Sequence, residues 1–457
     1  MKTSLSFFIY AIHYAIQLLI SSSGSHALPA FPGAEGFGAN ATGGRGGEVV
    51  FVTNLNDSGS GSFRDAVENT PGKKIVIFRV GGIIDLENRV SVNYEGTTIA
   101  GQTAPGGITL RNAGLRIAAS NVIVRGLRLR AGENLSEHEP EERDSIQIVG
   151  DGVRDVIIDR CSISWGVDEN ASTVYEVRNI TYQWNIMSEG LKNSVHPKGS
   201  HSAGLLIGDD ARNISILNNY FVHNNRRNPL LSSVHTAEVI NNVIYNWGKD
   251  SIQVQDFNET NNRAFVNIIG NYLKPGPSTT NPRALRMRLL PSGSKVFLED
   301  NAYEEDGSII DPMRKSRLVE IKNAPQPVSA PAFSGSGVRV LSASVAKDLV
   351  LAEAGAIWPQ RDAIDRRLVQ DFFNETGEMI DSPREVGGWP EPPTSEAPVD
   401  GDRDGMPDNW ELQQGLNPHN GSDNNLDADG DGYTNIEEYI NFAIRPQPQR
   451  YRLYRSP

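Results

Sequence analysis

The middle of the chain repeats a short pattern of apolar residues followed by a polar residue. From about residue 118, each unit has an apolar stretch that ends in a polar residue, usually Asn, and a further apolar pair then tends to follow. Aligning Arg160, Asn185, Asn219, Asn242 and Asn271 gives spacings of 25, 34, 23 and 29 residues. Variable spacings of this kind are typical of a solenoid with loops inserted on some turns. The segments that share the pattern are Val156–Arg160, Ile180–Asn185, Ile214–Asn219, Val239–Asn242 and Phe265–Asn271.

This pattern predicts an all-β fold, a parallel β-helix. One turn of such a solenoid cannot bury its inward Ile and Val side chains, whereas stacked turns enclose them in a common core. Asn residues at one corner of successive turns tolerate left-handed backbone conformations and can hydrogen-bond to the Asn residues above and below. A β-sandwich or a propeller is the alternative, but neither explains why Asn recurs at the same point of the unit.

The segments on either side of the repeat differ from it. Residues 28–117 contain short apolar runs, such as Val49–Val52, between Asn, Asp, Ser and Gly residues, which is typical of strands. Residues 324–337 are rich in Pro, Ala, Gly and Ser and are expected to form a loop. Ser344–Phe373 has helical spacing interrupted at Pro359.

These changes predict the domain boundaries. We expect a β-helix domain over residues 28–390, a proline-rich linker over 391–399 and a small acidic module over 400–445. Residues 1–27 resemble a signal peptide, because Lys2 precedes a mostly apolar stretch and Ser25-His26-Ala27 fits a cleavage site. A membrane anchor is the alternative, but the apolar stretch is short and interrupted for a span of about 20 residues. The protein is therefore expected to be secreted and extracellular.

Composition and charge narrow the possible partners. Cys161 is the only cysteine, so no internal disulfide is possible, and we expect it to be a small buried hydrophobe. The net charge is −13, and eleven acids but one base lie between Asp400 and Glu438. No basic stripe is present, so we expect no nucleic-acid partner. No segment other than the N-terminal stretch could cross a bilayer, so we expect no membrane partner. We also expect a monomer. Nine N-x-[ST] sequons permit glycosylation in a suitable host.

The acidic module contains two twelve-residue loops that fit the calcium pattern D-x-[DN]-x-[DN]-G-x₅-E. Alternate side chains of such a loop converge on one Ca²⁺, Gly permits the sharp turn, and the final Glu binds through both oxygens. The alternative is a solvated acidic linker, but its carboxylates would repel one another without cations. The module resembles the calcium loops of thrombospondin type 3 repeats and dockerins, without a full dockerin duplication. The expected ligands are Asp400, Asp402, Asp404 and Glu411 in the first loop, and Asp427, Asp429, Asp431 and Glu438 in the second.

Several motifs over roughly residues 30–390 resemble those of polysaccharide lyase family 1, the pectate lyases. The last of them matches the start of the family's R-x-P-x-x-R motif. The resemblance implies a right-handed parallel β-helix that cleaves (1→4)-α-D-galacturonan, in polygalacturonate or pectin, by calcium-assisted β-elimination. The motifs are Phe31-Pro32-Gly33-Ala34-Glu35-Gly36-Phe37-Gly38, Val52-Thr53-Asn54-Leu55-Asn56-Asp57-Ser58-Gly59, Gly101-Gln102-Thr103-Ala104-Pro105-Gly106-Gly107, Val195-His196-Pro197-Lys198-Gly199 and Arg227-Asn228-Pro229.

The resemblance assigns catalytic roles to two residues. Arg227 corresponds to the base and Lys198 to the catalytic lysine, and both are expected to bind substrate. His196 is a further substrate-binding candidate. β-Elimination removes the C5 proton beside a carboxylate, so the site must neutralise that carboxylate with Ca²⁺ and with the point charge of Lys198. Arginine is ordinarily protonated, so Arg227 needs a lowered pKa or a neutral form to act as a base.

The resemblance also implies an active-site calcium, held by Asp144 and Asp168. Two positions depart from the family: Ser164 stands where a third carboxylate is expected, and Ser232 where the motif has its second Arg. Glu169 is the candidate replacement for the missing ligand. These departures put the calcium affinity and the preference for unesterified substrate in question.

Three alternative functions remain open at this point. A pectin lyase would act on the methylated substrate. A β-helix hydrolase such as a polygalacturonase needs paired carboxylates, for which Asp209 and Asp210 are the candidates. A non-catalytic carbohydrate-binding protein would explain the departures at Ser164 and Ser232.

Overall fold

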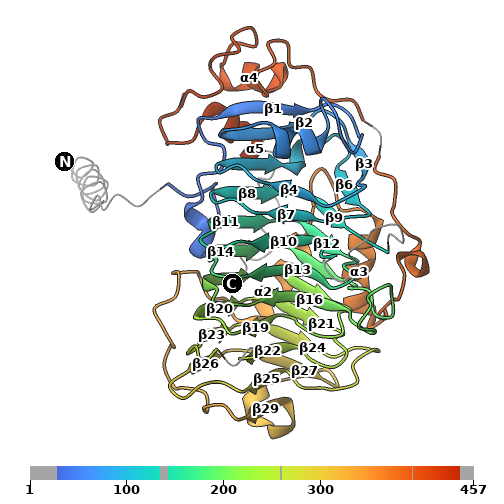
Figure 1. Ribbon diagram of the computed structural model, residues 1–457, viewed down its shortest axis with the longest axis vertical. Helices are drawn as coiled ribbons and strands as arrows, with labels where there is room; N and C mark the ends of the chain where they lie inside the picture. Colours follow the sequence, from blue (N-terminus) through green and yellow to red (C-terminus); the bar gives the residue numbers. More distant parts are fainter. Residues whose placement is uncertain (1–27, 134–142, 258–259, 394, 443–457) are drawn as a thin grey trace, which may run out of the picture.

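The protein folds as a right-handed parallel β-helix, which confirms the predicted fold class. The computed structural model describes residues 28–133, 143–257, 260–393 and 395–442. Three sheets, named A, B and C, run the length of the molecule. Figure 1 shows their strands stacked as one column, with sheet C between sheets A and B. The predicted signal peptide lies outside the described residues.

From β2 onward each turn of the helix contributes a strand to each sheet, with β28 as an additional strand of sheet B, and neighbouring strands are parallel except for β27 and β28. Sheet A comprises β1 Glu48–Val52, β2 Lys74–Phe78, β5 Thr97–Ala100, β8 Val122–Arg125, β11 Arg154–Asp159, β14 Arg178–Gln183, β17 Arg212–Leu217, β20 Thr236–Ile240, β23 Phe265–Ile269 and β26 Lys295–Glu299. Sheet B comprises β3 Gly82–Asp85, β6 Ile108–Arg111, β9 Arg128–Arg130, β12 Ser162–Ser164, β15 Ile186–Ser188, β18 Tyr220–Val222, β21 Val243–Tyr245, β24 Tyr272–Lys274, β27 Ala302–Glu305 and β28 Ser308–Ile310. Sheet C comprises β4 Val90–Val92, β7 Leu115–Ile117, β10 Ile146–Val149, β13 Glu169–Val174, β16 Ala203–Ile207, β19 Leu230–Ser232, β22 Ile252–Gln255, β25 Leu285–Arg288 and β29 Val319–Lys322.

Short helices connect or cover the turns. The predicted helical region forms two helices on either side of Pro359, α2 and α3, and the acidic module adds α4 and α5. The helices are η1 Phe37–Asn40, η2 Asp65–Asn69, η3 Gly101–Thr103, η5 Pro312–Arg314, η6 Ser316–Leu318, α2 Ala343–Glu353, α3 Ala363–Asn374, η7 Pro383–Val386, α4 Asp408–Gln414 and α5 Asn435–Phe442. None of the helices in the described ranges is both long and apolar enough to span a bilayer.

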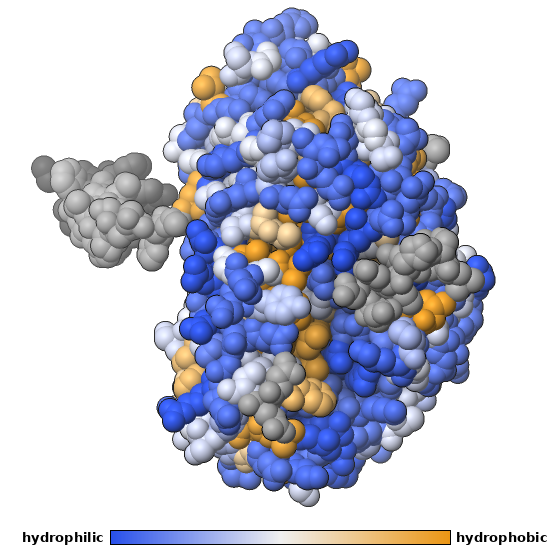
Figure 2. Space-filling model, in the orientation of Figure 1, coloured by the Kyte–Doolittle hydropathy of each residue, from blue (hydrophilic) through white to orange (hydrophobic). Residues whose placement is uncertain are grey.

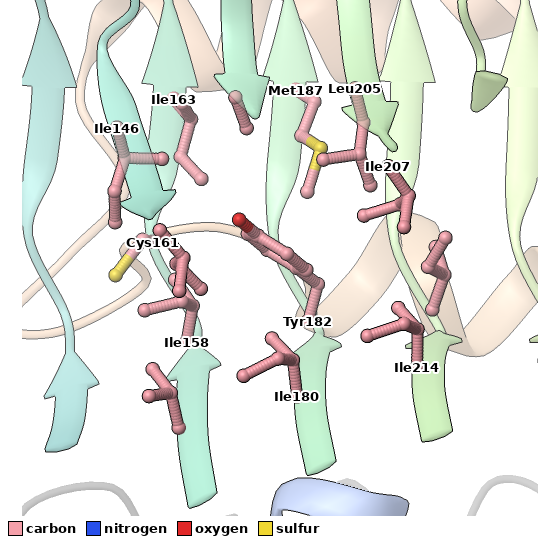
Figure 3. Close-up of a cluster of buried hydrophobic side chains, with 14 of the residues drawn as sticks. Ile146, Ile158, Cys161, Ile163, Ile180, Tyr182, Met187, Leu205, Ile207 and Ile214 are labelled. Carbon is pink, nitrogen blue, oxygen red and sulfur yellow. The ribbon is translucent and has the colours of Figure 1, made fainter. Parts of the chain in front are cut away.

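Aliphatic ladders fill the interior. Val156, Ile180 and Ile214 lie in register on three successive turns, and all three side chains are fully buried. Figure 3 shows such side chains from the three sheets meeting inside the helix, with Cys161 among them. Cys161 is the buried hydrophobe that the sequence predicts, and burial raises the pKa of its thiol to about 12.

An asparagine ladder runs along one corner of the β-helix, after the sheet A strand of successive turns. The amide of Asn185 donates to Asn219 Oδ1 at 3.0 Å, that of Asn219 to Asn242 Oδ1 at 3.0 Å, and that of Asn242 to Asn271 Oδ1 at 3.0 Å. The predicted Asn-to-Asn hydrogen bonds are therefore confirmed. They are strong because the side chains are buried, which makes each unmade bond costly.

The predicted alignment is wrong by one residue at its first member. Asp159 is in register with Gln183, so Cys161 and not Arg160 occupies the ladder column, and the Cys161 N–H donates to Asn185 Oδ1 at 2.9 Å. The residues with a left-handed backbone stand one position before the ladder residues, with φ of 50° at Arg160 and 56° at Trp184. The Asn residues therefore recur to bond the turns together, and their tolerance of left-handed backbone is not the reason.

Replacing Asn219 with alanine is expected to lower the free energy of unfolding by about 2–4 kcal/mol. The substitution leaves the Asn185 N–H, bonded to Asn219 Oδ1 at 3.0 Å, buried without a partner, and it removes the amide that donates to the Tyr182 carbonyl at 2.9 Å. Urea unfolding measures the effect. Asn88→Ala at an exposed position is the control, and equal midpoints for the two variants would contradict the ladder's role.

The outer faces of sheets A and B are covered, which leaves sheet C to present a site. Leu351, Leu368 and Phe372 of α2 and α3 pack on Tyr220 and Tyr245 of sheet B. The N-terminal segment, residues 324–337 and the acidic module pack on sheet A. Figure 2 shows that hydrophilic residues predominate in the view in which sheet C is central.

Candidate active site

The candidate catalytic residues lie at one edge of sheet C. Asp144 precedes β10, Asp168 directly precedes β13, and Glu169 is the first residue of β13. Arg227 precedes β19, which lies two strands further along the same sheet. Because parallel strands of a β-helix begin at the same edge, these corners lie in one column along that edge. The fold therefore brings together residues up to 83 positions apart in sequence.

Three carboxylates form a cluster at this edge. Asp144, Asp168 and Glu169 each place an oxygen within 4.8 Å of the others. Asp144 is 5% exposed, and its Oδ1 accepts the Glu169 N–H at 2.9 Å while Oδ2 accepts the Ser172 hydroxyl. Burial, together with the charge of Asp168, holds the pKa of Asp144 well above its usual range. Carboxylate oxygens are the ligands that Ca²⁺ prefers, so the donor set fits calcium.

Arg227 lies directly against this cluster. Its guanidinium pairs with the Glu169 carboxylate, so the residue expected to replace a missing calcium ligand also contacts the expected base. Burial lowers the pKa of Arg227, although the charges of Asp168 and Asp144 oppose that shift. Its φ of 61° is left-handed, which is costly for a side chain of this size and often marks a functional position. The backbone is held on both sides, since Leu205 N–H donates to Arg227 O at 2.7 Å and Arg227 N–H donates to Gln253 Oε1 at 3.2 Å.

Two histidines face Asp168 from the loop before β16. Nε2 of His201 lies 3.2 Å, and Nε2 of His196 3.6 Å, from Asp168 Oδ1. The two rings stack with centroids 3.6 Å apart. His196 was singled out from the sequence, whereas His201 was not. Its only sequence signal was a second imidazole five residues further along the same loop.

Lys198 lies between these histidines in a turn, with an exposed side chain. Its backbone N–H donates to His196 Nδ1 at 3.1 Å, which ties the turn to the histidine beside Asp168. The lysine is therefore on the loop that borders the carboxylate cluster.

The two departures from the family pattern are buried. Ser164 ends β12 in sheet B at 1% exposure, and its hydroxyl lacks a hydrogen-bond partner within the described part of the chain. Ser232 ends β19 at 6% exposure. Asp209 and Asp210 follow the other end of β16, and Asp210 contacts His235 at 3.5 Å and Asn262. That pair is therefore at the opposite edge of sheet C from Arg227.

The acidic module holds a second carboxylate cluster. Asp400, Asp402 and Asp404 each place an oxygen within 4.8 Å of the others, and Asp404 makes a further group of this kind with Glu411 and Asp423. Asp423 lies between the two predicted loops and was not expected as a ligand. Burial and repulsion from neighbouring carboxylates raise the pKa of Asp404 and that of Glu411 to about 7.

The second predicted loop is more open. Asp427, Asp429 and Asp431 also form a cluster, but all three are exposed. Their oxygens accept N–H groups of the loop itself, as in Gly432 N–H to Asp427 Oδ2 at 2.9 Å. Glu438, the expected last ligand, follows in α5 and is half-buried.

Known proteins provide an independent comparison. Over 429 residues the chain is 37% identical to a probable pectate lyase C from Aspergillus flavus, which covers 92% of this chain and 94% of the relative. Over 446 residues it is 36% identical to a probable pectate lyase C from Aspergillus fumigatus, with 94% and 97% covered. No family model matches the sequence.

Solved structures share the fold. The cedar pollen allergen Jun a 1 superposes with a TM-score of 0.50 at 18% identity, over 70% of this chain and 92% of the allergen. A pectate lyase bound to a hexasaccharide gives a TM-score of 0.50 at 13% identity, over 74% and 99%. At these identities the likeness extends to the β-helix alone.

Proposed function

The chain belongs to the pectate lyase family of polysaccharide lyases, and we propose that it cleaves (1→4)-α-D-galacturonan by calcium-assisted β-elimination, with Arg227 as the base. The observation that carries this proposal is the contact between Arg227 and a cluster of three carboxylates at the open edge of sheet C. An arginine alone, or an acidic cluster alone, is common on protein surfaces and would not indicate an active site. Their combination beside a left-handed backbone position supports a built site.

The reaction requires a base and a means of neutralising charge. Arg227 in its neutral form takes the C5 proton, and the electrons of the C5–H bond form the C4–C5 double bond. The C4–O bond breaks, and the leaving oxygen keeps its electrons and takes a proton from solvent. Asp144, Asp168 and Glu169 are the residues that would hold a calcium ion, and that ion would supply positive charge to offset the substrate carboxylate. Burial of the guanidinium lowers the pKa of Arg227 and so favours its neutral form, whereas the contact with Glu169 favours its charged form.

His196 and His201 support this site by holding Asp168. Both imidazole rings contact Asp168 Oδ1, and the stacking of the two rings holds them in place beside it. Imidazole nitrogen is a poor ligand for Ca²⁺, so we assign them to orienting the carboxylate. His196 is 5% exposed, and this burial suits an orienting role better than direct substrate contact.

Replacing Lys198 with alanine is expected to lower kcat/KM on polygalacturonate by about 100-fold, because an aimed charge on the substrate carboxylate is lost. Initial rates at saturating calcium measure it. Lys192→Ala in the same loop is the control, since its backbone and not its side chain supports the loop, through bonds of 2.7 Å from His201 N–H and 2.9 Å to Ile380 O. Equal rates for the two variants would argue against a catalytic role for Lys198.

One assay tests the function itself. Polygalacturonate is incubated with calcium and the ultraviolet absorbance of a 4,5-unsaturated product is followed, together with new reducing ends. Absorbance and reducing ends rising together support the lyase. Reducing ends without absorbance would indicate a hydrolase, and neither signal would indicate a binding protein. A faster reaction on methylated pectin than on polygalacturonate would instead indicate a pectin lyase.

Secretion, oligomeric state, calcium binding by the acidic module and glycosylation also belong to this proposal. We propose that residues 1–27 direct secretion, that the protein acts as a monomer, and that both loops of the acidic module bind Ca²⁺. Glycosylation is not expected at Asn170, because its side chain is fully buried and its amide donates to Ser188 O at 2.9 Å. The exposed Asn374 is a better candidate.

A further inference from the structure

The acidic module is packed against the β-helix and is not a free tail. Met406, Trp410, Ile436 and Ile440 form one buried cluster with Ile75, Ile77 and Ala100 on the outer face of sheet A. Met406 and Ile436 are fully buried. Figure 1 shows α4 and α5 at the end of the column that carries β1 and β2. The module therefore covers the first turns of the β-helix.

Polar contacts tie the same surfaces together. Arg45 pairs with Glu437 at 2.9 Å, and the Glu437 side chain is 6% exposed. Arg79 donates to Pro398 O at 2.7 Å and lies 3.4 Å from Asp400 Oδ2. These contacts come from segments before β1 and after β2, so they link the module to both sides of the first turn.

The first loop is built around buried oxygens that lack a partner. Both oxygens of Asp402, both of Glu411, Oδ2 of Asp404 and Oδ1 of Asp423 are buried without a hydrogen-bond donor among the described residues. Glu411 is fully buried and Asp404 is 2% exposed. Unpartnered buried carboxylates cost several kcal/mol, whereas Ca²⁺ takes about six to eight such oxygens. The arrangement is that of a cation cage whose fifth carboxylate, Asp423, lies outside the loop motif.

The residues of the cage and those of the docking surface are close neighbours in the sequence. Asp404 precedes the docked Met406 by two positions, and Glu411 directly follows the docked Trp410. A Cβ at Gly405 would lie 2.9 Å from the Val49 side chain of β1, so the loop itself touches the β-helix. A cation that orders the loop must therefore order the docking surface as well.

We propose that Ca²⁺ in the cage of Asp400, Asp402, Asp404, Glu411 and Asp423 clamps the module onto β1, β2 and β5 and thereby stabilises the first turns of the β-helix. This inference rests on the proposed calcium binding by the module and is independent of the lyase chemistry. The second loop contributes less to the clamp, because its three aspartates are exposed and already bonded within the loop.

Hydrogen exchange of the full-length protein tests the clamp. In excess calcium, peptides from β1 and β2 are expected to be protected, and in excess chelator they exchange faster, whereas peptides from β20 and β23 change little. With calcium at about 100 times its Kd, the Tm is expected to rise by roughly 3–5 °C over the chelated protein. If calcium binds by calorimetry but neither β1 and β2 protection nor Tm responds, the clamp is wrong although the binding is right.

Matched substitutions locate the effect in the first loop. Glu411→Gln is expected to remove one calcium equivalent from the calorimetric stoichiometry and to abolish the calcium-dependent protection of β1 and β2. Asp423→Asn is expected to weaken that same site at least tenfold. Glu438→Gln, the same change in the second loop, should leave β1 and β2 protected. Unchanged stoichiometry and protection in Glu411→Gln and Asp423→Asn would overturn the cage. Lyase activity is not the readout, so failure of the β-elimination proposal would appear separately.

Discussion

Arg227→Ala is expected to lower kcat on polygalacturonate by about 1,000-fold or more, with oligogalacturonate affinity nearly unchanged. A general base contributes about 10²–10⁴ to the rate, and no other group in the structure is assigned to the C5 proton. Arg227→Lys should recover little, because a lysine lacks the planar guanidinium that pairs with Glu169, and its amine is therefore not held at the position of the guanidinium nitrogens. Turnover is measured by the ultraviolet absorbance of the unsaturated product, and affinity by calorimetry with the inactive variant.

The neighbouring arginine provides the matched control for this variant. Arg226 has the same side chain, and its backbone forms the bridge to Ala203, but its side chain is not assigned to the site. Arg226→Ala should therefore retain turnover close to that of the unmodified protein. Substantial turnover by Arg227→Ala would remove the base assignment. Circular dichroism and Tm check that both variants retain the fold.

Asp168→Asn is expected to raise the calcium concentration for half-maximal activity at least tenfold. At a fixed low calcium concentration the rate should fall by about 100-fold. Of the three carboxylates, Asp168 is expected to show the largest effect on calcium affinity, because it contacts both histidines and also belongs to the cluster with Asp144 and Glu169. Its side chain is also 26% exposed, so the amide is tolerated sterically and folding is preserved.

Calcium titration of the initial rate measures this effect. The expected result is a curve displaced to higher calcium that approaches a plateau, because the remaining carboxylates still bind the ion weakly. Asp151→Asn, at an exposed turn beyond the far end of β10, is the control and should leave the curve in place. Superimposable curves for Asp168→Asn and the unmodified protein would contradict the assignment of an active-site calcium to this cluster.

The solenoid was predictable because its signal is local and repeated. Each turn must supply inward aliphatic residues, and Asn185, Asn219, Asn242 and Asn271 mark the same corner of four turns. The alignment failed by one residue at Arg160, because that turn has Cys161 in place of Asn and so lacks the marker. A sequence pattern identifies a ladder position only where the ladder residue itself is present.

The site was predictable only in part. Asp144, Asp168 and Arg227 stand in recognisable motifs, and the fold does bring them to one edge of sheet C. The contact between Arg227 and Glu169 was not foreseen, although each residue was singled out separately. His201 was missed because an isolated histidine in a loop carries no signal until its neighbour across the turn, Asp168, is known.

The sequence by itself determined the parallel β-helix, the buried Asn ladder and the two acidic loops, because each depends on residue types at short or repeated spacing. The candidate base, Arg227, came from the resemblance of its motif to that of the pectate lyases. Only the tertiary structure decided that the loops are docked on sheet A, that Asp423 joins the first of them, and that the carboxylates meet Arg227. Those contacts join positions separated by inserted loops of unequal length. Their proximity depends on how many turns lie between them and on which face of a turn is left uncovered. Local spacing in the sequence gives neither.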